Sequence, residues 1–285
     1  IVDAMDKGHV IPMGENIPPL TKEKLMQTTG VVAQMGYEPI LKALEEGYQL
    51  LIVGRAYDPA PFAALGVFKG HDLALSYHLG KVLECGALSC DPGTTKDCMM
   101  GVLGDDYFDV YPTSKTRKCT TLSVAAHTFY EKDHPYILHG PGCVMDLSMC
   151  TFKEVDKNRI RVQGSAIKPS DGYWIKLEGA RKVAYRTFVV AGVRDPLLIR
   201  KIKEVEVLVE ESVREQYSEI DPSLYTINFF NYGIDGVMGE LEPLKDVPHE
   251  VCVLFEVLAS TQEMASALCA SLRSTFMHYG YEGRK

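Results

Sequence analysis

The chain lacks the features that mark a membrane-spanning, a nucleic-acid-binding or a disulfide-stabilised protein. No stretch approaches the roughly 20 consecutive apolar residues that a membrane span needs. Lysine and arginine form no run beyond short local pairs, and the formal net charge is −8, so the basic surface of a nucleic-acid binder is missing. The eight cysteines form no C-x-x-C pair. A chain this long and rich in core residues needs no disulfide scaffold, so we expect a reducing compartment and a cytoplasmic protein.

Two nucleotide-binding motifs are missing as well. Neither G-x-G-x-x-G nor G-x-x-x-x-G-K-[ST] occurs, so no motif indicates a nicotinamide or a nucleoside triphosphate site. The remaining composition is that of an ordinary globular protein, with 285 residues, 46% of them hydrophobic and 24% charged. It supplies enough apolar material for one large or two modest domains.

Alternating helix and strand patterns predict an α/β fold. A helical stretch stops at Gly47, the apolar run 50–53 predicts a buried strand, and a turn then leads into a helix over 61–69. We expect a Rossmann-like parallel sheet in residues 1–150. Strand patterns dominate after it, so we expect a closely packed α+β part over residues 151–285. Within that part, residues 173–177 read as a strand, and 198–217 and 261–278 read as long amphipathic helices.

Four polar clusters concentrate chemistry between residues 54 and 146. They combine glycine or proline with groups that move protons or bind anions, a composition typical of active-site loops in α/β enzymes. The clusters are G-R-A-Y-D-P-A (54–60), H-L-G-K-V-L-E-C-G (78–86), R-K-C-T-T-L-S-V-A-A-H (117–127) and H-G-P-G-C-V-M-D (139–146). No single standard motif is present, so function has to be inferred from all four together.

The first two clusters predict an anion clamp and an acid–base pair. Arg55 directly follows the predicted strand, where α/β proteins bind ligands, and its guanidinium can hold a carboxylate or phosphate in a fork. Asp58 either orients that arginine or caps the next helix. Lys81 and Glu84 share a helix face, so in a dry cleft they can serve as charge stabiliser and base. The alternatives are a structural Arg–Asp pair and an ordinary surface salt bridge.

The third cluster offers a histidine. His127 lies four residues after Ser123 and four before Glu131, so the three can share a helix face. Because catalytic triads are not usually built at that spacing, His127 is better interpreted as a general base, a metal ligand or a buried histidine. These residue types also allow a zinc site from Cys85, Cys119 and His127. No cofactor is indicated beyond such a divalent metal.

The fourth cluster is a glycine-rich turn. Gly140 and Gly142 permit positive φ and a close approach to a ligand, and backbone N–H groups there can bind an oxyanion. A tight structural turn fits the same residues equally well. Later in the chain, Arg194 ends a predicted strand just before Pro196, and we count it as a further candidate for substrate binding.

Together the clusters resemble the acyclic terpene utilisation family, the AtuA-like proteins formerly known only as a domain of unknown function. The resemblance covers nearly the whole chain. Its matching stretches are V-A-Q-M-G-Y-E-P (32–39), G-R-A-Y-D-P-A (54–60), G-K-V-L-E-C-G-A (80–87), C-T-T-L-S-V-A-A-H-T-F-Y-E (119–131), K-L-E-G-A (176–180), G-V-R-D-P (192–196), Y-G-I-D-G-V-M-G (232–239) and A-S-T-Q-E-M-A (259–265). Cys143 departs from it, because a third glycine is expected after G-P-G.

The resemblance implies a role in the breakdown of acyclic terpenoids or other branched carboxylic acids, as free acids or CoA thioesters. It assigns no reaction. It also implies a small companion protein, and so a two-component enzyme. Family members typically begin before the position of Ile1, so the resemblance implies that this chain either lacks the first strands of a Rossmann-like domain or receives them from another chain.

The leading hypothesis is a lyase of the hydratase or dehydratase type that needs no organic cofactor. Arg55 holds the substrate carboxylate and Asp58 orients the arginine. Glu84 or His127 takes a proton α to the carbonyl, and Lys81 stabilises the developing enolate.

Two other functions stay open. The chain can be a non-catalytic subunit that binds an acyl ligand and organises a partner enzyme. Alternatively, Cys85 or Cys119 is a nucleophile in acyl transfer. In each case we expect a small-molecule partner, no nucleic acid and no membrane, and a homo-oligomer, which is the usual state of soluble enzymes.

Overall fold

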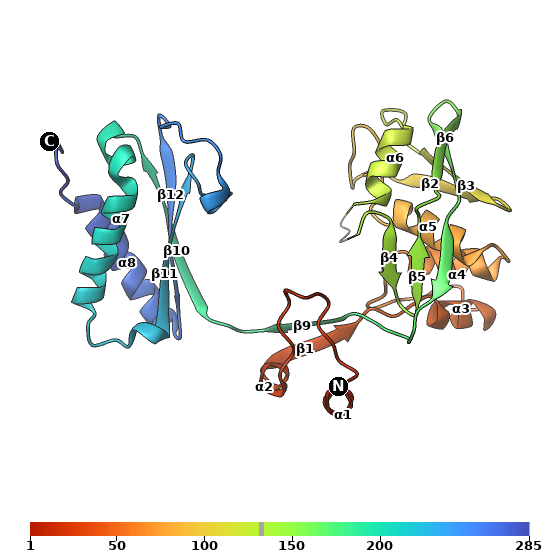
Figure 1. Cartoon of the computed structure of the whole chain (residues 1–285), viewed down its shortest axis with the longest axis horizontal. Coiled ribbons are helices and arrows are strands. Elements are labelled where there is room, and N and C mark those ends of the chain that lie inside the picture. Colours follow the sequence, from red (N-terminus) through yellow and green to blue (C-terminus); the bar gives the residue numbers. More distant parts are fainter. Residues whose placement is uncertain (131–133, 285) are drawn as a thin grey trace. The chain divides into compact units, whose positions relative to one another are not determined.

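The structure is a computed structural model that describes residues 1–130 and 134–284. The chain divides into two compact units, residues 1–181 and 182–285, which we describe separately. Both units combine helices with strands, which confirms the predicted α/β class in its coarse form (Figure 1). No helix in the described part is long and apolar enough to cross a membrane.

The first unit contains a long buried helix surrounded by shorter helices and small sheets. The helices are α1 (Val2–Asp6), α2 (Lys22–Met26), α3 (Glu38–Glu45), α4 (Ala60–Phe68), α5 (Leu73–Leu83) and α6 (Thr121–Thr128). The strands are β1 (Thr28–Ala33), β2 (Met99–Leu103), β3 (Tyr107–Pro112), β4 (Ile137–Gly140), β5 (Cys143–Asp146), β6 (Thr151–Asp156), β7 (Arg159–Gln163), β8 (Ala166–Pro169) and β9 (Leu177–Arg181). The sheet orders are β1–β9, β2–β3–β7–β6 and β4–β5–β8.

Helix α5 is the centre of the first unit. The Asp72 side chain caps it by accepting a hydrogen bond from the Leu75 N–H, as expected of an N-cap. Apart from its two terminal residues the helix is buried, because both of its faces meet hydrophobic clusters. Leu79 packs with the residues of β3 and β7, and Tyr77 packs with those of α4. Neighbouring elements on every side hold a helix that is buried all round. They therefore also fix the positions of Lys81 and Glu84, the charged residues at the end of α5.

The strand pairing differs from the parallel sheet that we expected. Every ladder in the described residues is antiparallel. The parallel pairing that occurs there is an isolated bridge between Met35 and Ala56. The Rossmann-like detail is therefore not confirmed. Hydrophobic periodicity indicates where a strand lies, but it carries no information on the direction of the strand beside it.

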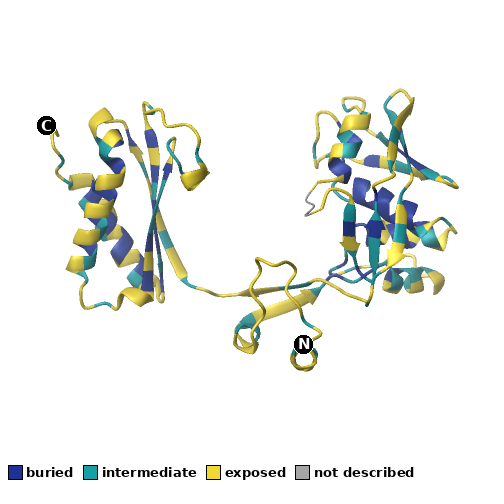
Figure 2. Ribbon diagram, in the orientation of Figure 1, coloured by how far each residue is buried: buried dark blue, intermediate teal, exposed yellow. Residues whose placement is uncertain are grey.

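Two predicted strands are wrong. Residues 50–53 form no strand, and Leu50 and Ile52 are 81% and 93% exposed. Within the described residues no strand pairs with this apolar run. Leu51 and Val53 pack partly against the core, whereas Leu50 and Ile52 belong to the exposed class, which is yellow in Figure 2. The strand expected over 173–177 begins only at Leu177, as β9.

Residues 151–181, which we expected in the second part, belong to the first unit. Strand β7 pairs with β3, and β9 pairs with β1 near the start of the chain. These non-local pairings bring the K-L-E-G-A stretch to the N-terminal elements, a relationship that no local sequence pattern reveals.

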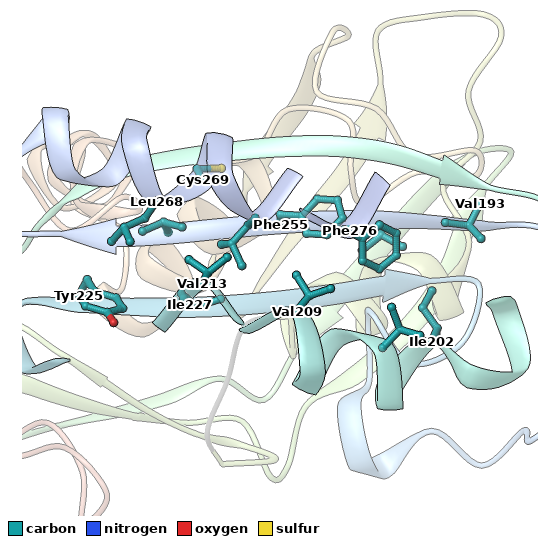
Figure 3. Close-up of a cluster of buried hydrophobic side chains, with 14 of the residues drawn as sticks. Val193, Ile202, Val209, Val213, Tyr225, Ile227, Phe255, Leu268, Cys269 and Phe276 are labelled. Carbon is teal, nitrogen blue, oxygen red and sulfur yellow. The ribbon is translucent and has the colours of Figure 1, made fainter. Parts of the chain in front are cut away.

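The second unit is a three-stranded antiparallel sheet with two long helices. Its elements are β10 (Tyr185–Val193), α7 (Pro196–Gln216), the 3₁₀ turn η1 (Pro222–Leu224), β11 (Tyr225–Tyr232), the 3₁₀ turn η2 (Gly239–Leu241), β12 (Val251–Ala259) and α8 (Gln262–His278). The sheet order is β10–β12–β11. Both long helices are confirmed. Their apolar faces, with Val209 of α7 and Phe276 of α8, pack against Phe255 of β12 (Figure 3).

Candidate functional site

Lys81 and Glu84 form a buried ion pair at the end of α5. Lys81 lies in the last turn of the helix and Glu84 is its C-cap residue. The Nζ of Lys81 bonds the Glu84 carboxylate, and each side chain is only 6% exposed. The negative end of the helix dipole stabilises the lysine charge and opposes the carboxylate charge there. The pair is therefore buried and is not the surface salt bridge that we kept as an alternative, while its role in acid–base chemistry stays a prediction.

The first cluster packs against α5 beside this pair. A Cβ on Gly80 would lie 2.7 Å from the carbonyl oxygen of Pro59, so only glycine lets the 54–60 turn approach the helix so closely. The half-buried Tyr57 belongs to this turn. Burial, followed by the nearby charge of Glu84, raises the pKa of the Tyr57 phenol. The phenol therefore stays protonated and can donate a hydrogen bond.

The fourth cluster also lies against Tyr57. Strands β4 and β5 form a hairpin in which Gly140 pairs with Cys143, and Gly142 between them has φ +66°, as a Pro-Gly turn requires. A Cβ on Gly140 would lie 3.1 Å from the Tyr57 ring. The Gly142 N–H donates to the Trp174 carbonyl. This turn is therefore structural, and the oxyanion role predicted for its Gly142 N–H is not supported.

Three tyrosine rings gather at the same place. The Tyr37 ring meets Tyr77 edge-on at a centroid distance of 5.7 Å, and the Tyr57 ring lies 5.9 Å from Tyr77 on another side. Tyr37 and Tyr57 each begin a tyrosine–acid–proline sequence at the start of a helix. Tyr37 is the N-cap residue of α3, and the Tyr57 sequence ends at Pro59, the N-cap residue of α4. Both segments thus bring a ring to Tyr77 of α5.

Cys143 and Glu38 border this aromatic cluster. Burial and the charge of Glu38 raise the pKa of the Cys143 thiol to about 11, so the sulfur stays protonated and is a poor nucleophile. The Tyr173 hydroxyl donates to Glu38 Oε2 at 2.7 Å. Burial and this hydrogen bond raise the pKa of Tyr173 to about 12. The site therefore has several hydroxyl donors and one buried charge pair.

Arg55 is already engaged. Its guanidinium donates to both oxygens of Glu178 in β9, and its Nη1 donates to Asp58 at 3.2 Å. The hydrogen bonds from Arg55, with those from Lys176, lower the pKa of Glu178 to about 2. The fork that we expected to hold a substrate carboxylate is thus occupied by a carboxylate of the chain itself. Asp58 orients Arg55, as one of our two readings predicts.

The third cluster has structural partners of its own. Ser123 and Thr120 form a capping box at the start of α6, which explains the serine without catalysis. His127 is 5% exposed and stacks on Tyr130 at 5.8 Å. Cys119 is buried, with its sulfur 3.8 Å from that of Cys90. It is not an accessible nucleophile. Glu131 lies outside the described residues.

Arg194 lies in the second unit, just after β10. Its Nη1 donates to the His249 carbonyl at 2.8 Å, and the next residue, Asp195, caps α7. The described structure thus gives Arg194 a structural partner and places it in a different unit from Arg55 and Glu84.

His78 is a buried histidine that sequence reasoning left unassigned. Thr128 uses its hydroxyl proton for the Val124 carbonyl, so its oxygen accepts from His78 Nε2–H at 3.1 Å. His78 Nδ1 then accepts from Ser165 at 2.7 Å. Burial lowers the pKa of His78 to about 3, so the ring is neutral and bonded on both nitrogens.

The predicted zinc site from Cys85, Cys119 and His127 is not assembled. Among the described residues no group of three or more His, Cys, Asp or Glu side chains is placed to hold a metal ion. Two surface hollows of this unit are lined by other residues. One includes Asp72, Asp106 and Ser165, and the other includes Lys115 and Arg159.

Sequence reasoning found the Lys81–Glu84 pair, but it missed Tyr57 beside Glu84 and missed Glu178 as the partner of Arg55. The repeated pattern, Y-E-P at 37–39 and Y-D-P at 57–59, is the signal that would have indicated the tyrosines. Nothing local indicates Glu178, because strand pairing brings it to Arg55 from 123 residues away.

Comparison with known proteins gives one match. The family model described as "Acyclic terpene utilisation family protein AtuA" matches residues 3–99 and 110–284. No curated protein and no solved structure matches the chain. The matched ranges include all four polar clusters and most of each unit. The chain belongs to the acyclic terpene utilisation family.

Proposed function

We propose that the chain is an acid–base enzyme of the lyase class, of the hydratase or dehydratase type. Its substrate is a carboxylic acid or CoA thioester derived from an acyclic terpenoid or another branched acid. The buried Lys81–Glu84 pair beside Tyr57 carries this proposal. An ion pair in a dry interior contributes little net stability, because desolvation offsets the Coulombic gain. Titratable groups kept in such places are typical of active sites.

The residues divide the chemistry as follows. Glu84 takes the proton α to the substrate carbonyl. The carbonyl oxygen then gains negative charge, which the Lys81 ammonium and a hydrogen bond from the Tyr57 hydroxyl stabilise. Glu84 returns the proton to the departing β-hydroxyl group, which leaves as water while a C=C bond forms. The reverse sequence adds water to that bond, and Glu84 ends each cycle as a carboxylate.

Arg55 and Asp58 take a positioning role in this proposal. Since Glu178 fills the Arg55 fork, a substrate carboxylate would have to displace it. The Arg55 fork instead holds the 54–60 turn, which carries Tyr57, on β9. A CoA thioester, whose reacting group carries no negative charge, fits this arrangement better than a free acid.

The test is a screen of branched 3-hydroxyacyl-CoA and 2-enoyl-CoA thioesters, and of the matching free acids, for gain or loss of water. We expect turnover by the native chain and a loss of about 10²–10⁴-fold for Glu84→Gln. Glu45→Gln, at an exposed glutamate of α3, is the matched control and keeps native turnover. A folded Glu84→Gln variant with native turnover contradicts the proposal.

A non-catalytic acyl-binding subunit is the second candidate. The observation that favours it is the exposed apolar run with Leu50 and Ile52, which suits a contact with a companion chain. Calorimetry with the same thioesters distinguishes the candidates. Tight binding with every ligand recovered unchanged, by the chain alone and with its companion, favours the binding subunit. Conversion of any ligand favours the enzyme.

A further inference from the structure

Three sulfur atoms from separate segments meet in the core of the first unit. Cys90 lies in the loop before β2, Met99 begins β2, and Cys119 directly precedes the N-cap of α6. Their residue exposures are 4%, 9% and 3%. Both cysteines are reduced thiols. The sulfurs therefore form a compact group from which water is excluded.

The spacing of these sulfurs is that of ligands around one ion. The Cys90 sulfur lies 3.0 Å from that of Met99 and 3.8 Å from that of Cys119, and the Cys119 and Met99 sulfurs are 3.9 Å apart. The point equidistant from all three lies about 2.1 Å from each, close to the ~2.3 Å of a metal–thiolate bond. Only a few tenths of an ångström of movement are needed to complete a trigonal site.

We propose that Cys90, Met99 and Cys119 form a binding site for one thiophilic monovalent metal ion, of which Cu(I) is the best fit. Two thiolates and a thioether are soft ligands, which select Cu(I) over oxygen-preferring ions. Structural zinc takes four ligands in a tetrahedron, whereas this group supplies three. Binding displaces the thiol protons to solvent and changes no oxidation state.

A fixed cation lies near this site. The Arg117 guanidinium is close enough to the Cys90 thiol to act on it electrostatically. Arg117 is itself fixed, through hydrogen bonds to Asp97 and to the Pro92 carbonyl. Once a metal ion displaces the thiol protons, this cation offsets part of the negative charge that the two thiolates carry.

A disulfide is the competing outcome. Asp91 and Lys118 face each other in an antiparallel bridge and exchange both backbone hydrogen bonds. Cys90 and Cys119 are therefore the next pair, at a non-hydrogen-bonded position where strands approach most closely. Oxidation could join them. A change at Met99 distinguishes the metal site from the disulfide, because the Met99 thioether can bind a metal but takes no part in a disulfide.

The experiment titrates the reduced chain anaerobically with Cu(I) against a chromogenic Cu(I) chelator. Sulfur-only coordination is read from X-ray absorption. We expect one tightly held equivalent with three sulfur neighbours. Met99→Leu, which keeps the core volume, should weaken binding about 10–100-fold or more, and Cys90→Ser should abolish it. Cys252→Ser, at an exposed cysteine of β12, is the control and leaves binding unchanged.

Each result bears on the proposal. Native affinity in folded Met99→Leu contradicts a three-sulfur site, and native affinity in folded Cys90→Ser contradicts the site altogether. Absence of a tight equivalent in the native chain, with ready formation of a Cys90–Cys119 disulfide under mild oxidant, shows a redox pair instead. Thermal unfolding of each variant confirms that the packing around the lost sulfur is intact.

Discussion

Arg55 donates two parallel hydrogen bonds to Glu178, from Nε to Oε2 at 2.7 Å and from Nη2 to Oε1 at 3.1 Å. This bidentate geometry is the strongest form of Arg–carboxylate contact. It joins the turn that carries Tyr57 to strand β9. The sequence assigned Arg55 to substrate binding. In the folded chain Arg55 instead links two distant segments, the 54–60 turn and β9, and we call this link the tether.

The tether predicts a local effect of Arg55→Lys. Lysine keeps the charge but loses the fork, so β9 should separate more often from the first cluster. We expect faster hydrogen exchange of the amides over 177–181, measured by mass spectrometry, with the second unit unchanged. Asp58→Asn, which disturbs one weaker bond, should have a smaller effect. Equal exchange in Arg55→Lys and the native chain would refute the tether.

Lys81→Met tests whether the buried pair is kept for function. Removing the ammonium leaves the Glu84 carboxylate buried without its lysine, which should cost about 3–5 kcal/mol of the free energy of unfolding. The double variant Lys81→Met/Glu84→Leu should recover most of that loss and remain inactive. Chemical denaturation measures both. A double variant as unstable as the single one would indicate that the pair is structural.

Tyr57→Phe removes one hydroxyl and keeps the ring. Because the phenol is expected to donate to the substrate carbonyl oxygen, kcat should fall about 10²–10³-fold. The melting temperature should change little, since the ring contact with Tyr77 is retained. Tyr48→Phe, at an exposed tyrosine, serves as the control. An unchanged kcat in Tyr57→Phe would remove the phenol from the mechanism.

His78 predicts how stability depends on pH. Burial lowers the pKa of His78 from 6.5 to about 3, so between these values the unfolded chain binds a proton that the folded chain does not. Stability is therefore full above pH 6.5 and falls as the pH drops toward 3, by on the order of several kcal/mol. His78→Asn should flatten this dependence, while His139→Gln, at an exposed site, should not. Denaturation midpoints across this range measure it.

The sequence predicted helices better than strands, for a physical reason. Helix α8 was predicted over 261–278 and is observed over Gln262–His278, because its hydrogen bonds are local and Thr261 caps it. The 50–53 run has the apolar composition of a buried strand, yet Ile52 is 93% exposed. Whether an apolar run becomes a strand depends on a partner elsewhere, and composition does not specify that partner.

The same distinction applies to the candidate site. Lys81 and Glu84 share one helix turn, so their pairing could be predicted from spacing alone. The contacts of Arg55 with Glu178 and of Cys119 with Cys90 could not, because Glu178 and Cys90 come from distant segments. Sequence reasoning therefore identified the reactive residue types. It did not identify the contacts within the chain that already occupy some of those side chains.

The most direct test of the account is α-proton exchange in D₂O, followed by ¹H NMR on the branched acyl-CoA thioesters. If Glu84 takes the proton α to the carbonyl, the native chain replaces that proton with deuterium, and Glu84→Gln slows the exchange about 10²–10⁴-fold. Exchange at the native rate in a folded Glu84→Gln variant, or turnover of a thioester without any exchange, would contradict the account.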